Sequence, residues 1–247
     1  RRLGVPLYVM LGGLARRRIP LMACLFPKSP DHAARAAAAF VEQGYRALKV
    51  KHFGKPELDV AITKAVRREF PTGYLQADTN GGYKSFAETA DMLPRLKEAG
   101  LDAVEDPGAL TLEAYSRLLA IQPRPILILD GPSRGDKAMG EIARLRPADA
   151  VNLHPNMQGT FTDIRDRAAA ARLAGLGVEI GGAGYTGVGA WAHLHVAAAL
   201  GEAYPYGELG GYVDHGMPAC TAAARMPIEA GMATVPDGPG HGGELNL

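Results

Sequence analysis

Three acidic residues and two lysines recur in this sequence at intervals that match one strand-and-helix unit. Asp78, Glu105 and Asp130 each end a short β-rich run, and they follow one another about 25 to 27 residues apart. Lys51 ends the run one interval earlier, and Lys49 shares its face because side chains alternate along a strand. Three carboxylates at neighbouring strand ends would repel one another unless a cation neutralised them. All-oxygen ligation suits a hard cation, so the pattern predicts a Mg²⁺ site.

Each of these residues, taken alone, also has an ordinary structural interpretation. A single acid at the end of a strand commonly caps a loop or is solvated, and a strand-end lysine is commonly solvated as well. Loop caps and solvated charges need no regular interval along the chain. The recurrence therefore favours a shared site over several separate structural roles.

The elements that would hold these residues alternate between β-rich runs and alanine-rich helical stretches. We predict strands at residues 21–26, 45–51, 74–78, 102–105, 125–130, 150–153, 178–181 and 206–208. We predict helices near residues 30–43, 56–70, 85–99, 112–121, 136–145, 161–174 and 189–200, with Ser29 and Gly44 capping the first. This order is typical of βα units and favours a (β/α)₈-type TIM barrel, whose C-terminal strand ends share one mouth. An open doubly wound sheet is the alternative, because alternation does not show strand order.

The composition is that of a globular chain of 247 residues, with 47% hydrophobic and 21% charged residues and a formal net charge of +1. This near-balance of charge argues against a nucleic-acid or membrane-surface protein. No apolar run approaches the ~20 residues of a membrane span, and the first residues lack the apolar region of a signal peptide. Two cysteines, Cys24 and Cys220, cannot form a disulfide framework, so we expect a cytoplasmic protein.

Several motifs together resemble the enolase superfamily, specifically the mandelate racemase and muconate lactonizing enzymes. The motifs are residues 3–8 (LGVPLY), 11–13 (LGG), 44–51 (GYRALKVK), 78–83 (DTNGGY) and 104–107 (VEDP). The resemblance implies a Mg²⁺-dependent isomerase or lyase that removes a proton α to a carboxylate through an enediolate intermediate. Racemisation or epimerisation, dehydration and cycloisomerisation are the implied outcomes. It also implies the modified (β/α)₇β form of the barrel, here without the N-terminal capping domain of the family.

The resemblance also implies roles for individual residues. Asp78, Glu105 and Asp130 would bind Mg²⁺, Lys51 would be the acid/base, and Lys49 would support it. A lysine is an effective base only if its pKa is depressed, and a neighbouring ammonium group or metal ion can do this.

His154 stands where the family carries a second catalytic lysine. Strands two and six lie across the mouth of an eight-stranded ring, so we predict His154 as a second acid/base opposite Lys51. A polar strand-end residue without a catalytic function is the alternative. Gly131 and Tyr185 depart from the family pattern in another way, because each stands about where many relatives carry an acid.

We expect a small carboxylate substrate and a homo-oligomer, with no nucleic-acid or membrane partner. The residues expected to contact the substrate are Asn80, Asn152, Tyr185 and Glu208. Two other functions stay open. One is a non-catalytic barrel that binds a metal or a partner. The other is a TIM-barrel enzyme for a phosphorylated substrate, which would be held by the glycine-rich residues 181–189.

The predicted organisation has three parts. Residues 1–20 form a lead-in segment, residues 21–215 form the barrel with its site at the C-terminal strand ends, and residues 216–247 form a tail that packs on the barrel. Residues 235–240 are expected to be a loop because they are rich in glycine and proline.

Overall fold

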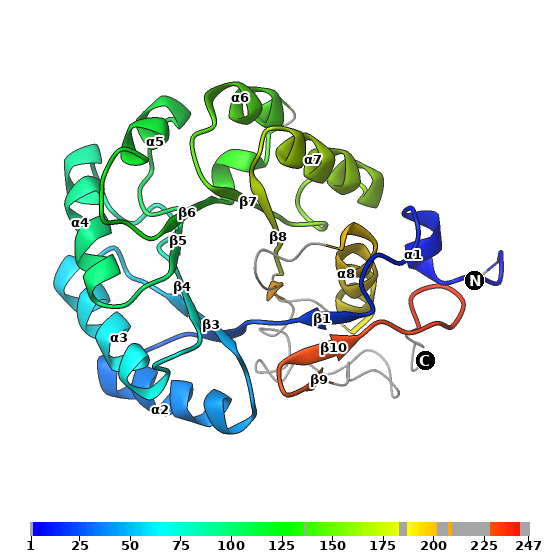
Figure 1. Cartoon of the computed structure of the whole chain (residues 1–247), viewed down its shortest axis with the longest axis horizontal. Helices are drawn as coiled ribbons and strands as arrows, with labels where there is room; N and C mark the ends of the chain where they lie inside the picture. Colours follow the sequence, from blue (N-terminus) through cyan, green and yellow to red (C-terminus); the bar gives the residue numbers. More distant parts are fainter. Residues whose placement is uncertain (1, 136, 183–186, 202–206, 209–227, 243–247) are drawn as a thin grey trace.

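Seven parallel strands form one curled sheet whose spatial order follows the order along the chain (Figure 1). The computed structural model describes residues 2–135, 137–182, 187–201, 207–208 and 228–242. The strands are β2 (Ala23–Leu25), β3 (Ala47–Lys51), β4 (Tyr74–Asp78), β5 (Ala103–Glu105), β6 (Ile126–Leu129), β7 (Ala150–Leu153) and β8 (Gly177–Ile180). A doubly wound sheet reverses its strand order, and these seven strands do not. The predicted α/β barrel architecture is confirmed, and the open-sheet alternative is wrong.

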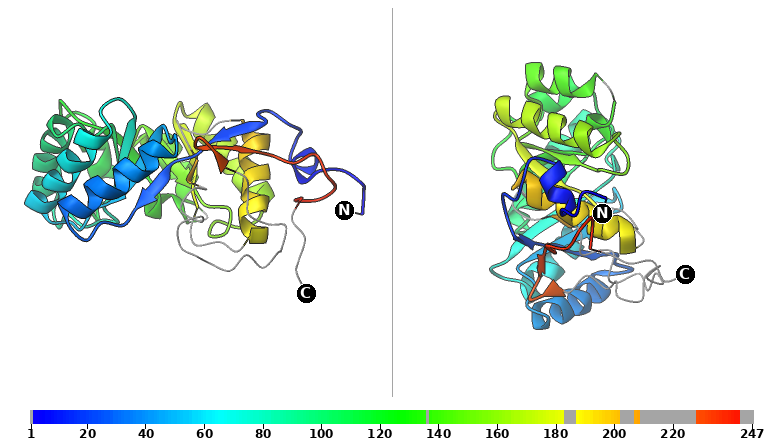
Figure 2. Two further views of the ribbon diagram at one scale, coloured as in Figure 1. Left: turned by 90° about the horizontal axis from the view of Figure 1, so that it is seen from below. Right: turned by 90° about the vertical axis from the view of Figure 1, so that its right-hand side faces the viewer.

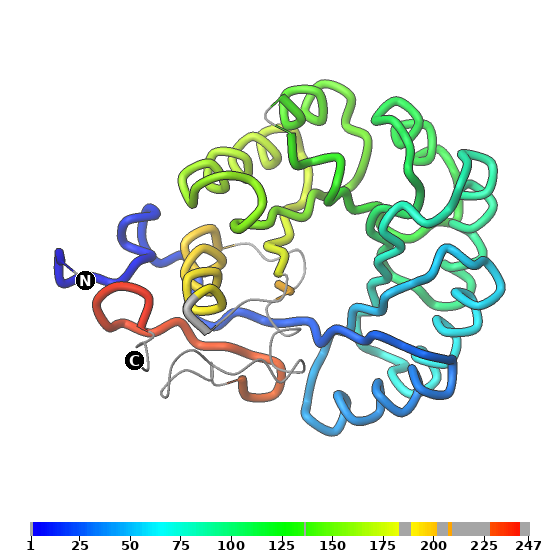
Figure 3. The backbone as a smooth tube through the Cα atoms, turned by 180° about the vertical axis from the view of Figure 1, so that it is seen from behind, coloured from blue at the N-terminus to red at the C-terminus, as the bar shows by residue number. Residues whose placement is uncertain are grey.

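The connecting helices lie outside the ring of strands, as Figure 3 shows from behind. They are α2 (Pro30–Glu42), α3 (Pro56–Glu69), α4 (Phe86–Glu98), α5 (Leu112–Leu118), α6 (Ala138–Leu145), α7 (Phe161–Leu173) and α8 (Gly187–Leu200), with a 3₁₀ turn η1 (Gly131–Ser133) after β6. The predicted caps of α2 are present, because Ser29 Oγ accepts from the His32 amide at 3.2 Å and Gly44 follows with φ +84°. Among the described helices, none is long and apolar enough to cross a membrane.

The sheet divides the buried apolar side chains into two clusters. The larger cluster lies between strands and helices and includes Leu48, Ile62 and Leu75. The smaller one consists of Ala103, Ile128 and Ala150, with Tyr74 and Ile126 packed against it. Ala103 and Ala150 begin β5 and β7, and Ile128 pairs with Ala150, so this cluster lies on the N-terminal side of the polar side chains of the barrel interior. The space nearer the C-terminal strand ends is left for polar side chains.

A second, antiparallel sheet joins segments that are far apart in the sequence. In it, β1 (Arg18–Pro20) pairs with β10 (Met232–Thr234), which pairs with β9 (Ile228–Glu229). The short helix α1 (Leu7–Met10) lies at the end of the molecule away from α3 and α4, beside the segment that follows β10 (Figure 2), and the Leu7 amide donates to the Gly240 carbonyl at 2.7 Å. We predicted a lead-in and a tail without these strands, because runs of two or three residues carry no detectable period. The domain boundary predicted at 215/216 lies outside the described residues.

The predicted eighth strand, at residues 206–208, is described at Gly207 and Glu208 only. Gly207 forms a parallel bridge with Leu21, in which its amide donates to the Pro20 carbonyl and its carbonyl accepts from the Met22 amide, both at 2.9 Å. The regular part of the first barrel strand is therefore shorter than predicted and begins at Ala23. The Gly207 bridge brings Glu208 to the interior of the ring.

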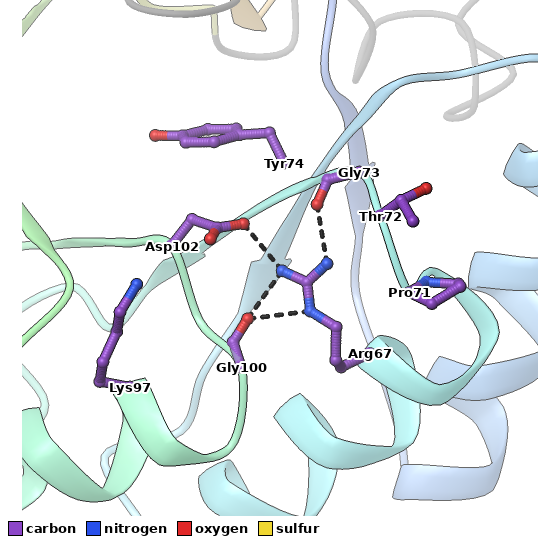
Figure 4. A pocket seen from close by; sticks show the side chains of 8 residues that line it. All are labelled: Arg67, Pro71, Thr72, Gly73, Tyr74, Lys97, Gly100 and Asp102. Atoms are coloured by element: carbon purple, nitrogen blue, oxygen red, sulfur yellow. Dashed lines mark hydrogen bonds and ion pairs between the residues drawn. The ribbon is translucent and has the colours of Figure 1, made fainter.

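The guanidinium group of Arg67, on α3, ties together two loops at the N-terminal ends of the strands (Figure 4). It donates to the carbonyl of Gly73 at 2.7 Å and to that of Gly100 at 2.7 and 2.9 Å. It also donates at 2.8 Å to the carboxylate of Asp102, which accepts from the Leu75 amide at 2.9 Å. One side chain thus satisfies the polar groups that precede both β4 and β5.

Replacing Arg67 by alanine should lower the free energy of unfolding by about 2 kcal/mol, because several partly buried acceptors lose a charged donor together. Urea denaturation followed by circular dichroism measures this loss. Arg68→Ala is the matched control, because the neighbouring Arg68 is exposed and bonds only the adjacent Glu69. Equal destabilisation by the two substitutions would contradict a special role for Arg67.

Candidate active site

The C-terminal ends of β3, β4 and β5 place three of the predicted residues side by side. In the strand register Lys51 is the neighbour of Asp78, and Asp78 is the neighbour of Glu105. Lys51 Nζ forms an ion pair with Asp78. Its side chain is 32% exposed, whereas that of Lys49, on the same face one step deeper, is 2% exposed. Of the two lysines, Lys51 is therefore the one that a molecule at the mouth can reach.

The ammonium group of Lys49 lies among three buried carboxylates. Its Nζ is 2.6 Å from Glu105 Oε2 and 3.4 Å from Asp78 Oδ2, and it also forms an ion pair with Glu208. Burial alone would lower the pKa of Lys49, but the carboxylates outweigh it and hold that pKa well above its usual range. Lys49 is thus a fixed positive charge and not a proton acceptor.

Burial and the lysines oppose each other at both Asp78 and Glu105, but the balance differs. Burial would raise the pKa of Asp78, but the two lysines outweigh it and keep the pKa below its usual value. Burial raises the pKa of Glu105 well above its usual value, although Lys49 opposes the shift. Asp78 is therefore the more firmly ionised carboxylate of the two.

Two further polar residues on the barrel strands, Gln76 and Glu179, lie beside these buried charges and were not predicted. Gln76 Nε2 donates to Glu105 Oε2 at 3.0 Å and to Glu179 Oε1 at 3.3 Å. Glu179 is fully buried, and burial together with the nearby Glu208 carboxylate raises its pKa well above the usual range. The available signal was a single polar residue inside an apolar β-rich run, at the spacing that faces the interior.

Asp130 follows β6 and is held from two sides. The side chain of Arg134 forms an ion pair with its carboxylate, with Arg134 Nε 3.0 Å from Oδ1. The carboxylate of Asp106 accepts from the Asp130 amide at 3.1 Å and from the Gly131 amide at 2.8 Å. Burial raises the pKa of Asp106 to about 6, while these amides oppose the shift. Asp106 therefore positions the backbone that carries Asp130.

His154 follows β7 and is buried close to two of the acids. Its Nε2 is 3.5 Å from Asp130 Oδ1 and 3.9 Å from Glu208 Oε2. Burial lowers the pKa of His154 below its usual value despite these carboxylates. The imidazole is therefore neutral near pH 7, the form that can accept a proton or bind a metal ion.

Two groups of described side chains offer ligand atoms close enough together for one metal ion. Glu105, Asp130 and His154 form the first group, and Glu105, Glu179 and Glu208 form the second. Within each group the ligand atoms lie within 4.8 Å of one another, and every residue is buried. The donor set of the first group fits a divalent cation. Asp78 is in neither group, since its carboxylate faces the lysines, and its role as a metal ligand stays a prediction.

The four residues predicted to contact substrate lie in different surroundings. Asn152 is fully buried, and its Nδ2 donates at 3.2 Å to both Glu105 and Glu208. Glu208 is also buried, and both residues support the carboxylates around Lys49. Asn80 is exposed at the mouth, with φ +50° and its amide 3.0 Å from Asp78 Oδ1. Tyr185 and part of the glycine-rich segment 181–189 lie outside the described residues.

This arrangement combines an accessible amine with a buried group of carboxylates. Such acids can hold a divalent cation, which stabilises negative charge where it develops on a bound molecule. An amine at the same mouth can accept or return a proton next to that charge. The geometry is therefore suited to proton transfer at a carbon beside an anionic group.

The family model that matches this chain is described as enolase C-terminal domain-like and covers residues 31–247. The chain is 31% identical to an N-succinylamino acid racemase of Thermus thermophilus, over 100% of this chain and 65% of the relative. It is 30% identical to a hydrophobic dipeptide epimerase of Roseobacter litoralis, over 100% of this chain and 70% of the relative.

A solved structure shares the fold. It is a mandelate racemase/muconate lactonizing family protein from Azoarcus, which superposes with a TM-score of 0.87 at 27% identity, over 99% of this chain and 68% of that one. The chain spans between about half and about two thirds of the length of most of the curated relatives that it matches.

Replacing Arg134 by glutamine should tighten the binding of Mg²⁺ by roughly two- to fivefold, because the guanidinium group competes with a cation for Asp130 from a partly exposed position. Isothermal titration calorimetry with Mg²⁺ on the wild type and the Arg134 variant measures the change in affinity. Arg144→Gln, an exposed position on α6, is the control for lost positive charge. Unchanged or weaker affinity in the Arg134 variant alone would contradict this competition.

Proposed function

The chain belongs to the enolase C-terminal domain-like family, and from this premise we propose that it is the barrel of a Mg²⁺-dependent isomerase or lyase. The proposed reaction begins with removal of a proton α to a carboxylate and leads to racemisation, epimerisation, elimination or cycloisomerisation. One observation carries the proposal: the partly exposed Lys51 stands beside Asp78 at the edge of a buried carboxylate group. No described feature favours the non-catalytic or phosphate-binding alternatives.

Lys51 is the proposed base. In its neutral form it takes the proton from the carbon α to the substrate carboxylate at Nζ, and it can return a proton to the same face. Its exposure supports this role, because the other lysine of the pair is enclosed by acids. One base suffices for exchange at one face or for a syn elimination.

The carboxylates of Asp78, Glu105 and Asp130 would hold Mg²⁺, whose charge stabilises the second negative charge that proton loss places on the substrate. Lys49 adds a permanent positive charge beneath them through its contacts with Glu105 and Asp78. It favours the ionised form of both acids and holds them in place, because an ammonium group among carboxylates offsets their mutual repulsion; at Asp78 this effect outweighs burial, and at Glu105 it only opposes it.

The relatives suggest a substrate class. Their names specify an N-succinylamino acid and a hydrophobic dipeptide, both of which have a carboxylate whose α-carbon bears an acylated nitrogen. We propose that this chain acts on a small carboxylate of this kind. The charged mouth formed by Lys51, Asp130 and Arg134 is consistent with an anionic substrate.

Lys51→Met should lower the rate of α-proton exchange by about 10² or more, because the group that takes the proton is lost. The measurement is deuterium incorporation in D₂O, followed by NMR over a panel of N-acylamino acids and dipeptides with Mg²⁺ present. Exchange reports deprotonation even where no net product forms.

Lys55→Met serves as the control for Lys51→Met, because Lys55 is an exposed lysine four residues further along. Exchange at the wild-type rate in the Lys51 variant would refute the mechanism. A wild-type chain without exchange on any member of the panel would refute the proposed function.

Glu105→Gln should weaken Mg²⁺ binding by at least about tenfold, because a charged ligand becomes a neutral amide at the centre of the carboxylate group. Calorimetry with Mg²⁺ measures the affinity, and Glu98→Gln on the exposed face of α4 is the matched control. Equal affinity in wild type and the Glu105 variant would remove Glu105 from the metal site.

A further inference from the structure

The imidazole of His154 faces the buried carboxylates but forms no hydrogen bond with any of the described residues. Its Nε2 lies 3.5 Å from Asp130 Oδ1, and its ligand atom lies within 4.8 Å of those of Glu105 and Asp130. Both ring nitrogens are buried, and neither has a hydrogen-bond partner among the described residues. A buried polar side chain is almost always paired, so a ring left open toward two acids points to a missing partner.

The backbones that carry His154 and Asp130 are tied together by a buried chain of hydrogen bonds. Gln158 Oε1 accepts from the His154 amide at 2.9 Å, and Gln158 Nε2 donates to Ser133 Oγ at 2.8 Å. Ser133 Oγ donates in turn to the Asp130 carbonyl at 2.7 Å. Ser133 and Gln158 are both buried. These hydrogen bonds therefore hold His154 and Asp130 in one relative position.

Gly181 lies against the edge of the ring that carries Nε2. A Cβ built on Gly181 would lie 2.4 Å from His154 Nε2 and 2.3 Å from Asn152 Oδ1. Only a glycine at this position leaves room for the imidazole to stay beside the acids. The ring is thus confined between the Gly181 backbone and the carboxylate of Asp130.

We propose that His154 is a direct ligand of the divalent cation held by Glu105 and Asp130, which makes the site a mixed nitrogen and oxygen site. The proposal rests on the proposed function and changes its metal. Mg²⁺ favours oxygen ligands, whereas imidazole suits borderline transition metals. We therefore expect this chain to prefer Mn²⁺, and more strongly Co²⁺ or Zn²⁺, over Mg²⁺.

This assignment competes with the second-base role predicted for His154. A nitrogen that binds the cation has its lone pair committed and cannot also accept a proton from the substrate. An imidazole is also shorter than a lysine side chain, so at this strand end it reaches back to Asp130 more readily than out to the mouth.

The test is pulsed EPR of the Mn²⁺ complex of the 247-residue chain, which detects ¹⁴N coupling from a directly bound imidazole. The same samples are titrated with Mn²⁺ and Mg²⁺ by calorimetry and assayed for α-proton exchange with each enantiomer. We expect ¹⁴N coupling in wild type and in His195→Asn, a control at another buried histidine, whose ring stacks on Tyr8. We expect no coupling in His154→Leu or His154→Asn, with Mn²⁺ affinity reduced about tenfold or more and Mg²⁺ affinity reduced less.

Each other outcome overturns the inference. Mn²⁺ bound without ¹⁴N coupling in wild type excludes the imidazole as a ligand, and continued exchange in that sample leaves the proposed function standing. Loss of exchange for one enantiomer in His154→Asn, at unchanged metal affinity, would assign the second-base role instead. A wild-type chain that neither binds a divalent cation nor exchanges the proton would refute both proposals. The wild-type spectrum decides the matter even if a His154 variant fails to fold.

Discussion

A single ammonium group, that of Lys49, lies enclosed among the carboxylates of Glu105, Asp78 and Glu208. Burying charges is costly, and a buried pair that loses one member leaves an uncompensated charge. These acids come from β4, β5 and the segment that bridges to Leu21 just before β2, so one cation connects both sides of the ring closure. The barrel interior therefore depends on this set of charges, because the loss of Lys49 would leave its partners buried without compensation. The metal site, the accessible lysine and the ring closure share this constraint.

The strand-end residues could be predicted because each has a signal in the sequence around it. A β-rich run that ends in a charged residue, repeated at one interval, places Lys51, Asp78 and Glu105 on neighbouring strands without knowledge of the fold. Glu179 could not be assigned in this way, since its partners come from strands distant in sequence. The β1 and β10 strands were missed for a related reason: they are short, and their stability comes from each other and not from a local pattern.

His154 shows a second limit of sequence reasoning. Its position opposite Lys51 follows from counting strands around a ring, but the direction of its ring does not. That direction depends on the hydrogen bonds through Gln158 and Ser133. It also depends on the glycine at position 181, because any larger residue would clash with the ring. None of these contacts has a signature in the spacing of residues. The family pattern has a lysine at this position. The shorter imidazole that replaces it changes which groups the side chain can reach.

The pairing of β1 with β10 also bears on how the chain folds during synthesis. Arg18 pairs with Thr234, so β1 leaves the ribosome more than two hundred residues before its partner exists. At about 5 to 20 residues per second, its edge waits for roughly 10 to 40 s. An unpaired strand edge is a template for association with other chains. All seven parallel strands are therefore synthesised while this early edge is still open, and the antiparallel sheet can close only as a late step.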